Sequence, residues 1–317
     1  MILRAVLRKR AKAGILVEEE ALMALAEPLT ATIPTAPGRK PRDDELDLFG
    51  LTHPGKVRPE NQDHFLLGTV NPQVVIHGTS LPEPDNLPLR GDRLATVMLV
   101  ADGVGSGSAG GEASRLATES ITRYVSSTLR CYHSVGSSAE EEFFDALRQA
   151  ALEAHSTVRN EAAGRPDAPR MATTLTLGIA VWPWLYVVQV GDSRCYLHKD
   201  GVLRRTTRDQ TMAQDLVDRG ALPPERLAAS PFSHVLVSAI GGEEAKPEVT
   251  RVDIRKRGCV VLLCTDGLTK HVSDEEICAK IDAMESSEHL CRELLDLALE
   301  RGGSDNITVL AGRARKR

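Results

Sequence analysis

Two apolar stretches of the sequence end in an aspartate that is followed by glycine. Residues 98–103 read Met-Leu-Val-Ala-Asp-Gly, and residues 261–267 read Val-Leu-Leu-Cys-Thr-Asp-Gly. Stretches of this composition predict buried strands, so Asp102 and Asp266 should each stand where a strand leaves its sheet. The glycine that follows has no Cβ, which lets the backbone come close to whatever the aspartate holds. One Asp-Gly pair is common in turns, but two pairs placed in this way favour a shared binding site.

Two polar segments place further carboxylates beside predicted strands. Residues 58–63 read Arg-Pro-Glu-Asn-Gln-Asp, and residues 303–306 read Gly-Ser-Asp-Asn. Hard divalent ions such as Mg²⁺ and Mn²⁺ prefer oxygen ligands and require neither histidine nor cysteine. A cluster of aspartates with backbone carbonyls suits these ions, although each aspartate could also be an ordinary turn or cap residue. We therefore predict a metal site formed by four carboxylates, namely Asp63, Asp102, Asp266 and Asp305.

An arginine close to one of these aspartates suggests what the metal site acts on. Two neighbouring divalent ions can lower the pKa of a shared water and polarise a phosphoryl group. Arg58 lies in the same short loop as Asp63, so one loop can supply a metal ligand and a fork for the phosphate oxygens. Phosphate monoesters are very slow to hydrolyse in water, so such a site would have a substantial barrier to lower. The alternative for Arg58 is a surface ion pair.

The elements that position these residues follow from the apolar pattern. Strands are predicted in hairpins and helices in pairs, which is typical of an α+β fold with antiparallel sheets rather than a wound parallel sheet. The predicted strands are 49–52, 64–67, 98–101, 174–181, 185–190, 194–198, 202–205, 235–237, 249–254, 259–264 and 307–310. The predicted helices lie within 113–125, 138–158, 212–219 and 287–298, and another begins at Ser273; capping boxes are expected at Ser138 and Ser273.

The chain divides into three parts at its proline-rich and basic segments. Residues 1–45 are predicted to form an amphipathic helix, to about residue 27, and a proline-rich linker. Residues 46–312 form the globular domain, and 313–317 are a basic tail. Within the domain, 71–93 is a loop-like insertion of lid or surface-excursion length. The first part either packs on the domain or serves as a docking or localisation element.

Composition excludes several classes of function. The net charge of −5 and an aromatic content of 3% are unfavourable for nucleic-acid binding. No apolar run approaches the roughly 20 residues that span a bilayer, and no signal peptide is evident, so a cytoplasmic protein is expected. The six cysteines show no CxxC spacing and are expected to be buried and reduced, and the nine histidines form no ligand cluster in the sequence.

Five blocks of the sequence resemble, in order, the signature blocks of the PPM family. These are the metal-dependent protein serine/threonine phosphatases, also called protein phosphatase type 2C, and the chain is similar to bacterial-type members. The resemblance spans residues 49 to 312. Any one block is weak because Asp-Gly pairs are common, but five in family order are a strong signal. The blocks are 58–63, 102–105, 191–194, 265–267 and 303–306.

The resemblance implies a fold and a role for each residue. The fold is a β-sandwich of two antiparallel sheets flanked by pairs of helices (four layers, αββα), with the metals between loops at one edge. The segment 206–233 corresponds to a mobile flap over the substrate. By motif position, two Mg²⁺ or Mn²⁺ ions would be held by Asp63, Asp102, the Gly103 carbonyl, Asp266 and Asp305; a third ion by Asp192 with Asp266; and the substrate phosphate by Arg58. Gly-Asp-Ser at 191–193 is also a good hairpin turn, so Asp192 has a purely structural alternative.

The sequence departs from the family pattern in several positions. Val104 stands where some members have a histidine proposed as general acid, which leaves the proton donor unassigned; His53 is a conceivable donor. Ala172 replaces the glycine before the threonine pair 173–174, which we interpret as strand residues. Gln210 replaces the histidine after Asp209, and we interpret Asp209 as structural.

The sequence as a whole predicts a protein-serine/threonine phosphatase, a phosphoric monoester hydrolase. A metal-activated water would hydrolyse phosphoserine and phosphothreonine without a covalent intermediate, since no cysteine has an arginine at the sixth following position. The expected partners are phosphoproteins, with a Ser/Thr kinase opposing the reaction, and the expected state is a monomer in signalling. Two alternatives remain open: a non-catalytic interaction protein with a phosphatase fold, and a small-molecule phosphomonoesterase.

Overall fold

The computed structural model describes residues 38–73, 75–77, 79–80, 89–105, 108–132, 139–165, 171–227 and 229–316, and only the backbone of 128–132 and 139 is described. The predicted helix within 1–27 and the predicted cap at Ser138 lie outside the described residues. The compact part of the chain begins at Gly38, before the predicted boundary at Leu46. In the described part of the chain, no helix is long and apolar enough to cross a membrane.

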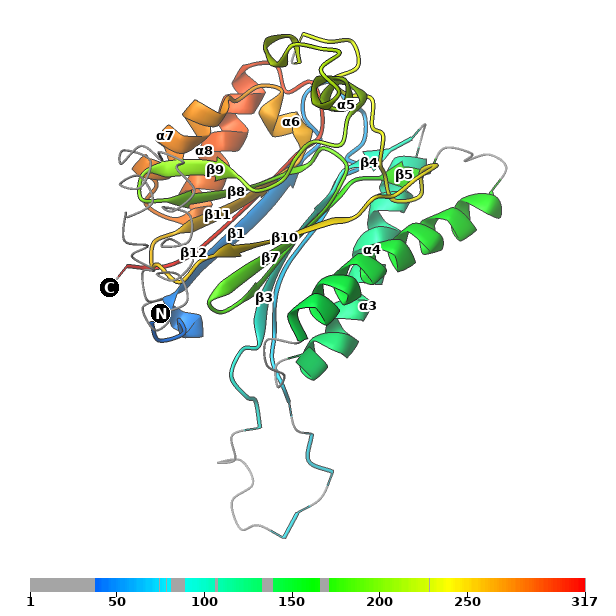
Figure 1. Cartoon of the computed structure of the whole chain (residues 1–317). Coiled ribbons are helices and arrows are strands. Elements are labelled where there is room, and N and C mark those ends of the chain that lie inside the picture. The colour runs from blue at the N-terminus through cyan, green and yellow to red at the C-terminus, as the bar shows by residue number, and fades with distance from the viewer. Residues whose placement is uncertain are drawn as a thin grey trace, which may run out of the picture. The chain divides into compact units, whose positions relative to one another are not determined.

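Two antiparallel sheets of five strands each form the centre of the domain (Figure 1). This confirms the predicted α+β sandwich. The first sheet has the order β1 (Leu46–His53), β12 (Ile307–Ala314), β11 (Val260–Cys264), β8 (Arg194–Lys199) and β9 (Val202–Arg205). The second has the order β10 (Glu248–Asp253), β7 (Trp184–Val190), β6 (Leu175–Val181), β3 (Ala95–Ala101) and β2 (His64–Val70). A small third sheet pairs β4 (Gly103–Val104) with β5 (Ala172–Thr173).

Both faces of the central strands are buried, which explains their continuous apolar sequences. In β11, Val261 and Leu263 belong to the core between the two sheets. The alternate residues Val260 and Leu262 belong to the core under the helices of the first sheet. Since side chains alternate between faces along a strand, a strand covered on both sides needs apolar residues at every position.

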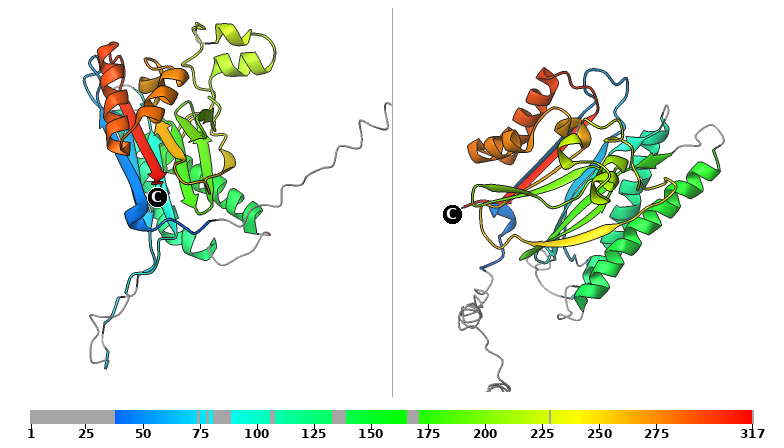
Figure 2. Two further views of the ribbon diagram at one scale, coloured as in Figure 1. Left: turned by 90° about the vertical axis from the view of Figure 1, so that its left-hand side faces the viewer. Right: turned by 45° about the horizontal axis from the view of Figure 1, so that its top comes forward.

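Helices cover the outer faces of the two sheets and complete four layers (Figures 1 and 2). α3 (Ala109–Tyr132) and α4 (Ala139–Ala163) cover the second sheet, and α7 (Asp274–Ala283) and α8 (Ser287–Glu300) cover the first. The predicted capping box of α7 is present, because Ser273 and Glu276 exchange hydrogen bonds. Between β9 and β10 lie α5 (Met212–Asp218) and a 3₁₀ turn at Pro224–Arg226.

Two local predictions differ from the structure. The predicted strand at 235–237 was wrong: Leu236 makes only an isolated bridge to Thr211, and Val235 is 41% exposed. β-Branched residues alone do not make a strand when no neighbouring strand is available to pair with them. At the other boundary, β12 continues to Ala314, so the start of the predicted basic tail belongs to the sheet.

The segment before β1 is held to the domain by polar contacts, which explains why the compact part begins early. The Trp182 indole donates to the Gly38 carbonyl, and Arg93 donates to the Pro41 carbonyl. Glu45, in the 3₁₀ turn Asp43–Glu45, pairs with Arg257. Of the predicted insertion at 71–93, the described residues include one antiparallel bridge between Gln73 and Arg90.

Candidate metal centre

Pairing within the second sheet brings two of the predicted carboxylates together. Asp63 comes directly before β2, and Asp102 directly follows β3. β2 and β3 are antiparallel, with His64 opposite Ala101, so the start of one strand lies beside the end of the other. Asp63 and Asp102 therefore stand at the same edge of the sandwich.

The first sheet supplies the other carboxylates at that edge. Asp266 follows β11 and begins the one-turn helix α6 (Asp266–Thr269), while Asp305 lies just before β12. Asp192 lies in the joint between β7 and β8, and the first residue of β8 is opposite the last residue of β11. Five carboxylates from both sheets thus converge where strands enter and leave.

These residues surround an open cleft of about 690 Å³. Its walls carry four of the predicted carboxylates, the predicted arginine and the Gly103 backbone. Asp63 does not line the cleft but lies near enough for its charge to act on Asp102. The polar lining includes Arg58, Asp102, Gly103, Asp192, Asp266 and Asp305, together with Gln62, His234, Lys270 and Asn306.

Two buried carboxylate oxygens in this cluster, Asp63 Oδ1 and Asp266 Oδ1, accept no hydrogen bond from any residue that the structure describes. The other oxygen of Asp63 accepts hydrogen bonds from Thr308 at 2.6 Å and Thr265 at 2.9 Å. Asp63 is 4% exposed, and an unpaired charge at such a site is costly unless a cation compensates it. The residues present therefore fit a group of divalent cations, for which carboxylate oxygens are suitable ligands.

The electrostatics of the cluster also favour a cation. The pKa of Asp63 is raised to about 7, mainly by burial and in addition by the charges of Asp266 and Asp305, while the hydrogen bonds from Thr308 and Thr265 oppose the shift. Burial, and then the neighbouring carboxylates, raise the pKa values of Asp102 and Asp192 well above the usual range. Like charges crowded in a place of low polarity disfavour ionisation, and bound cations reverse this preference.

Two protein cations already reach into the cluster. Arg58 donates to both oxygens of Asp305, at 2.7 and 2.9 Å, and its side chain remains 55% exposed at the cleft. Lys270 Nζ lies 2.7 Å from an oxygen of Asp266 and 2.7 Å from an oxygen of Asp305. Burial opposes the charged form of Lys270, but these two carboxylates raise its pKa above the usual value. For Asp305, burial is likewise outweighed by hydrogen bonds from Arg58 and Lys270, which lower its pKa.

The glycines after Asp102 and Asp266 are required by close packing against other backbone segments. A Cβ on Gly267 would lie 1.9 Å from the Asn306 carbonyl oxygen, and one on Gly103 would lie 2.3 Å from the Gly110 carbonyl oxygen. Asn306 in turn donates to the carbonyls of Pro54 and Glu60. These contacts fasten the loop that carries Arg58 and Asp63 to the start of β12.

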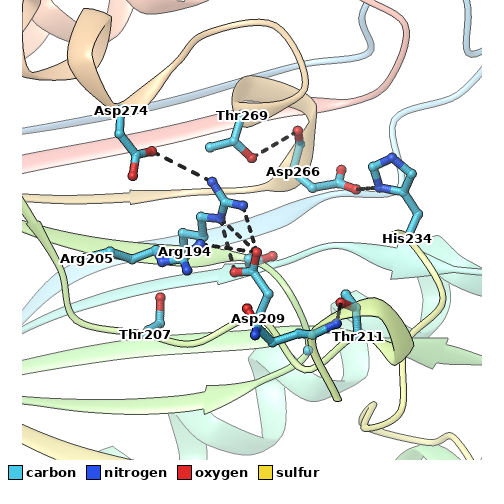
Figure 3. Close-up of polar contacts among 12 residues, drawn as sticks. Arg194, Arg205, Thr207, Asp209, Thr211, His234, Asp266, Thr269 and Asp274 are labelled. Carbon is cyan, nitrogen blue, oxygen red and sulfur yellow. Dashed lines mark hydrogen bonds and ion pairs between the residues drawn. The ribbon is translucent and has the colours of Figure 1, made fainter. Parts of the chain in front are cut away.

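Residues interpreted as structural prove to support the site from behind. The Thr174 hydroxyl accepts from the Asp102 amide at 3.0 Å, and the Thr173 hydroxyl donates to the Asp102 carbonyl at 2.8 Å. Asp209 accepts a fork from Arg194 (Figure 3). Gln210 accepts from the amide of Gly191, next to Asp192, at 2.9 Å. These bonds fix the backbone that presents Asp102 and Asp192.

Two residues of the cleft were missed from the sequence. The contact of Lys270 could have been predicted from the sequence, because Lys270 stands four residues after Asp266, the spacing of an ion pair on one helix face. The position of His234 could not have been predicted in this way. Its Nδ1 lies 3.8 Å from an Asp266 oxygen (Figure 3), and it groups with Asp192 and Asp266 as a set of metal-ligand side chains. The sequence did not reveal this grouping, which brings one histidine to two carboxylates that are distant along the chain. His53 accepts a hydrogen bond from the Gly55 amide and does not line the cleft.

The like charges at this edge lead to a testable effect on stability. A carboxyl group whose folded-state pKa is raised adds stability at low pH that is lost as the pH rises through that pKa. For Asp63 this stability is lost as the pH rises from about 4 to about 7. We expect Asp102→Asn to raise the melting temperature of metal-free protein near pH 7.5 by at least about 2 °C, or about 1 kcal/mol for a domain of this size. Near pH 4 the variant and the wild type should melt together. Thermal unfolding in chelator at both pH values checks this, and a variant that is less stable at both would contradict it.

Comparison with known proteins agrees with this geometry. The family model described as Protein phosphatase 2C matches residues 78–298. Serine/threonine protein phosphatase PstP of Mycobacterium tuberculosis is 34% identical over 216 residues, which are 68% of this chain and 40% of that protein. Serine/threonine phosphatase stp of Listeria monocytogenes is 29% identical over 260 residues, covering 82% of this chain and 92% of that protein. The chain therefore spans less than half the length of the Mycobacterium relative.

Solved structures show the same architecture. The crystal structure of M. tuberculosis PstP matches with a TM-score of 0.69 and 28% identity, over 86% of this chain and 99% of that one. The PstP catalytic domain in complex with two manganese ions matches with a TM-score of 0.66 and 28% identity, over the same shares. A family model that matches most of the chain, on a fold shared with these structures, establishes that the chain belongs to the protein phosphatase 2C family.

Proposed function

We propose that this protein is a metal-dependent phosphatase that hydrolyses phosphoserine and phosphothreonine in proteins. One observation carries the proposal: Asp63 and Asp266 each have a buried carboxylate oxygen without a hydrogen-bond partner in the described part of the chain, beside a cleft that holds Arg58. Such a cluster accommodates cations, and the arginine accommodates an oxyanion. The two manganese ions in the related PstP structure support the same assignment.

The carboxylates would hold two Mg²⁺ or Mn²⁺ ions, and Asp192 with Asp266 would hold a third. When bound, these ions supply Lewis acidity, which lowers the pKa of a water and polarises the phosphoryl group. In the net reaction the water oxygen bonds to phosphorus, and the bond from phosphorus to the serine or threonine oxygen breaks. The ligands for the first two ions would be Asp63, Asp102, the Gly103 carbonyl, Asp266 and Asp305.

The protein's own groups bind and orient the substrate. The two bonds from Arg58 to Asp305 fix the plane of the guanidinium at the cleft, where it can bind the non-bridging phosphate oxygens. The predicted ion pair and the predicted phosphate contact are thus compatible roles of one side chain. Leu236 and His234 line the cleft directly after the segment 206–233, and we propose that this segment influences substrate access.

The proposal extends to biological context. We propose a monomeric cytoplasmic enzyme that opposes a Ser/Thr kinase, because protein substrates of such a phosphatase carry the products of that kinase. The relatives named as serine/threonine phosphatases support phosphoproteins as the substrate class.

Phosphate release from a phosphothreonine peptide tests the proposed activity. We expect turnover with Mn²⁺ and none after addition of a chelator, with restoration when Mn²⁺ is added in excess. Turnover of an aryl phosphate without any turnover of the peptide would instead favour a small-molecule phosphomonoesterase. A folded, Mn²⁺-loaded protein that releases phosphate from neither substrate would be an interaction protein.

Arg58→Ala should raise the KM for the phosphopeptide by about tenfold or more, with a smaller effect on kcat. The basis is that a charged hydrogen bond to an anion contributes about 1.5–3 kcal/mol. Arg58→Lys keeps the charge but loses the planar fork, so its KM should lie between the other two. Steady-state kinetics on the three proteins provide the measurement, and an unchanged KM and kcat in Arg58→Ala would refute the assigned role.

A further inference from the structure

A second group of potential metal ligands lies outside the cleft, between β8 and α7. It consists of His198, Cys278 and Asp282, whose ligand atoms all lie within 4.8 Å of one another. His198 Nε2 is 3.0 Å from an oxygen of Asp282. We propose that these three side chains bind a divalent transition ion of the zinc type, at a site independent of the carboxylate cluster.

These residues come together because side chains on one face of β8 pack against side chains along one face of α7. Tyr196 and His198 are two residues apart on β8 and share the face that packs against α7, whereas Leu197 faces the other sheet. Two residues of strand advance about 6.6 Å, and one turn of helix, four residues, advances about 6 Å. The Tyr196 hydroxyl donates to Asp274 at 2.8 Å, which fixes the register at the start of α7.

That register places the potential ligands opposite one another. Asp274, Cys278 and Asp282 stand at four-residue intervals and therefore share one stripe of α7. With Tyr196 at Asp274, His198 lies farther along the stripe, beside Cys278 and Asp282. The Cys278 sulfur also lies 3.9 Å from the carbonyl oxygen of Gly201, in the turn after β8. The three ligands are positioned by packing before any ion arrives.

An unsatisfied nitrogen points to a missing ligand at this site. His198 is 7% exposed, and its Nε2 makes no hydrogen bond to any described residue. The Asp282 oxygen lies within reach, but its direction does not satisfy hydrogen-bond geometry. Buried polar nitrogens almost always have a partner, because an unpaired one costs free energy. A metal ion bound by His198 Nε2 and the Asp282 carboxylate would satisfy both.

The chemistry of the ligands selects the kind of ion. Imidazole and thiolate favour Zn²⁺ and similar transition ions over Mg²⁺ or Mn²⁺. Cys278 is only partly buried, whereas the other four cysteines with described side chains are buried. On binding, its thiol releases a proton, and the thiolate with the Asp282 carboxylate balances the double positive charge of the ion. His198 and Asp282 also line a surface hollow of about 660 Å³, which leaves room for a water as fourth ligand.

The site is separate from the proposed catalytic centre in position and in chemistry. Six residues of extended chain, about 20 Å, separate His198 from Asp192. The catalytic cluster offers oxygen ligands, and this group offers nitrogen, sulfur and oxygen. An ion here would tie α7 to β8 and so stabilise the layer that covers the first sheet.

Titration of the full-length, chelator-treated protein with Co²⁺ tests the proposal, because cobalt replaces zinc and reports its ligands by absorption. We expect a thiolate-to-cobalt charge-transfer band that saturates at one ion per chain and is removed by Zn²⁺. Cys278→Ser should abolish the band. Asp282→Asn should weaken binding by at least about tenfold, since loss of an outer-sphere partner alone has effects of that size.

Asp266→Asn provides the matched control, because it alters the oxygen cluster and leaves the thiolate site intact. Retention of the band in this variant separates the two sites, whatever the outcome of the phosphatase assay. The proposal is overturned if saturating Co²⁺ gives no thiolate band in the wild type, or if the band survives in Cys278→Ser. Cys278 is partly exposed and Asp282 is exposed, so substitutions at these two positions test the site without altering the buried His198.

Discussion

Asp266→Ala should lower kcat for a phosphothreonine peptide by about a thousandfold, because several kcal/mol of metal-dependent stabilisation of the transition state would be lost. Asp266 makes several contacts within the cluster. Its Oδ1 is buried and has no hydrogen-bond partner among the described residues, its Oδ2 lies 2.7 Å from Lys270 Nζ, and His234 Nδ1 lies 3.8 Å from the same oxygen. Its charge also contributes to the raised pKa values of Asp63 and Asp102.

The same substitution should leave the fold intact. Removing one of several crowded like charges relieves repulsion in the metal-free protein, although Lys270 loses one of its two partners. Steady-state kinetics with Mn²⁺, together with thermal unfolding, separate loss of chemistry from loss of structure. Asp296→Ala is the matched control, since Asp296 is an exposed carboxylate on α8 that does not line the cleft. Comparable turnover by Asp266→Ala and Asp296→Ala would remove Asp266 from the catalytic cluster.

The parts of this site that could be predicted from sequence are those with local causes. Asp102 and Asp266 stand directly after buried strands, so their place at a sheet edge follows from composition. The reason for the glycine after Asp266 is not local, because a Cβ there would lie 1.9 Å from the carbonyl oxygen of Asn306. Antiparallel pairing then brings Asp63 beside Asp102 in the second sheet, and Asp305 beside Asp266 in the first.

The parts that escaped prediction depend on contacts between distant segments. Lys270 bridges Asp266, which is near in sequence, and Asp305, which is not, so only half of its role had a local pattern. His234 reaches the cleft from a segment that the structure leaves without regular strands, where apolar composition wrongly predicted one. His198 and Cys278 meet only because β8 packs on α7. No spacing rule along the chain expresses such packing.

Lys270→Met should raise the affinity of the cleft for Mn²⁺ by about ten- to a hundredfold. The ammonium lies 2.7 Å from Asp266 and 2.7 Å from Asp305, and its side chain is only 21% exposed. At such a site, unit charges interact with energies of a few kcal/mol. A divalent cation that takes the same oxygens must displace the ammonium or remain beside it, and both cost binding free energy. Methionine keeps most of the side-chain length and removes the charge.

Calorimetric titration of Mn²⁺ into chelator-treated protein measures this effect without relying on turnover. Lys270→Arg is the control, because it keeps the positive charge and should bind Mn²⁺ about as the wild type does. The Met variant should also show a higher KM for the phosphopeptide, since Arg58 would remain as the protein cation at the cleft among the residues described. Equal Mn²⁺ affinity in all three proteins would show that the ammonium does not compete with the metal. Weaker binding in the Met variant would reverse the argument, because Lys270 would then be holding Asp266 and Asp305 in the geometry that the ion requires.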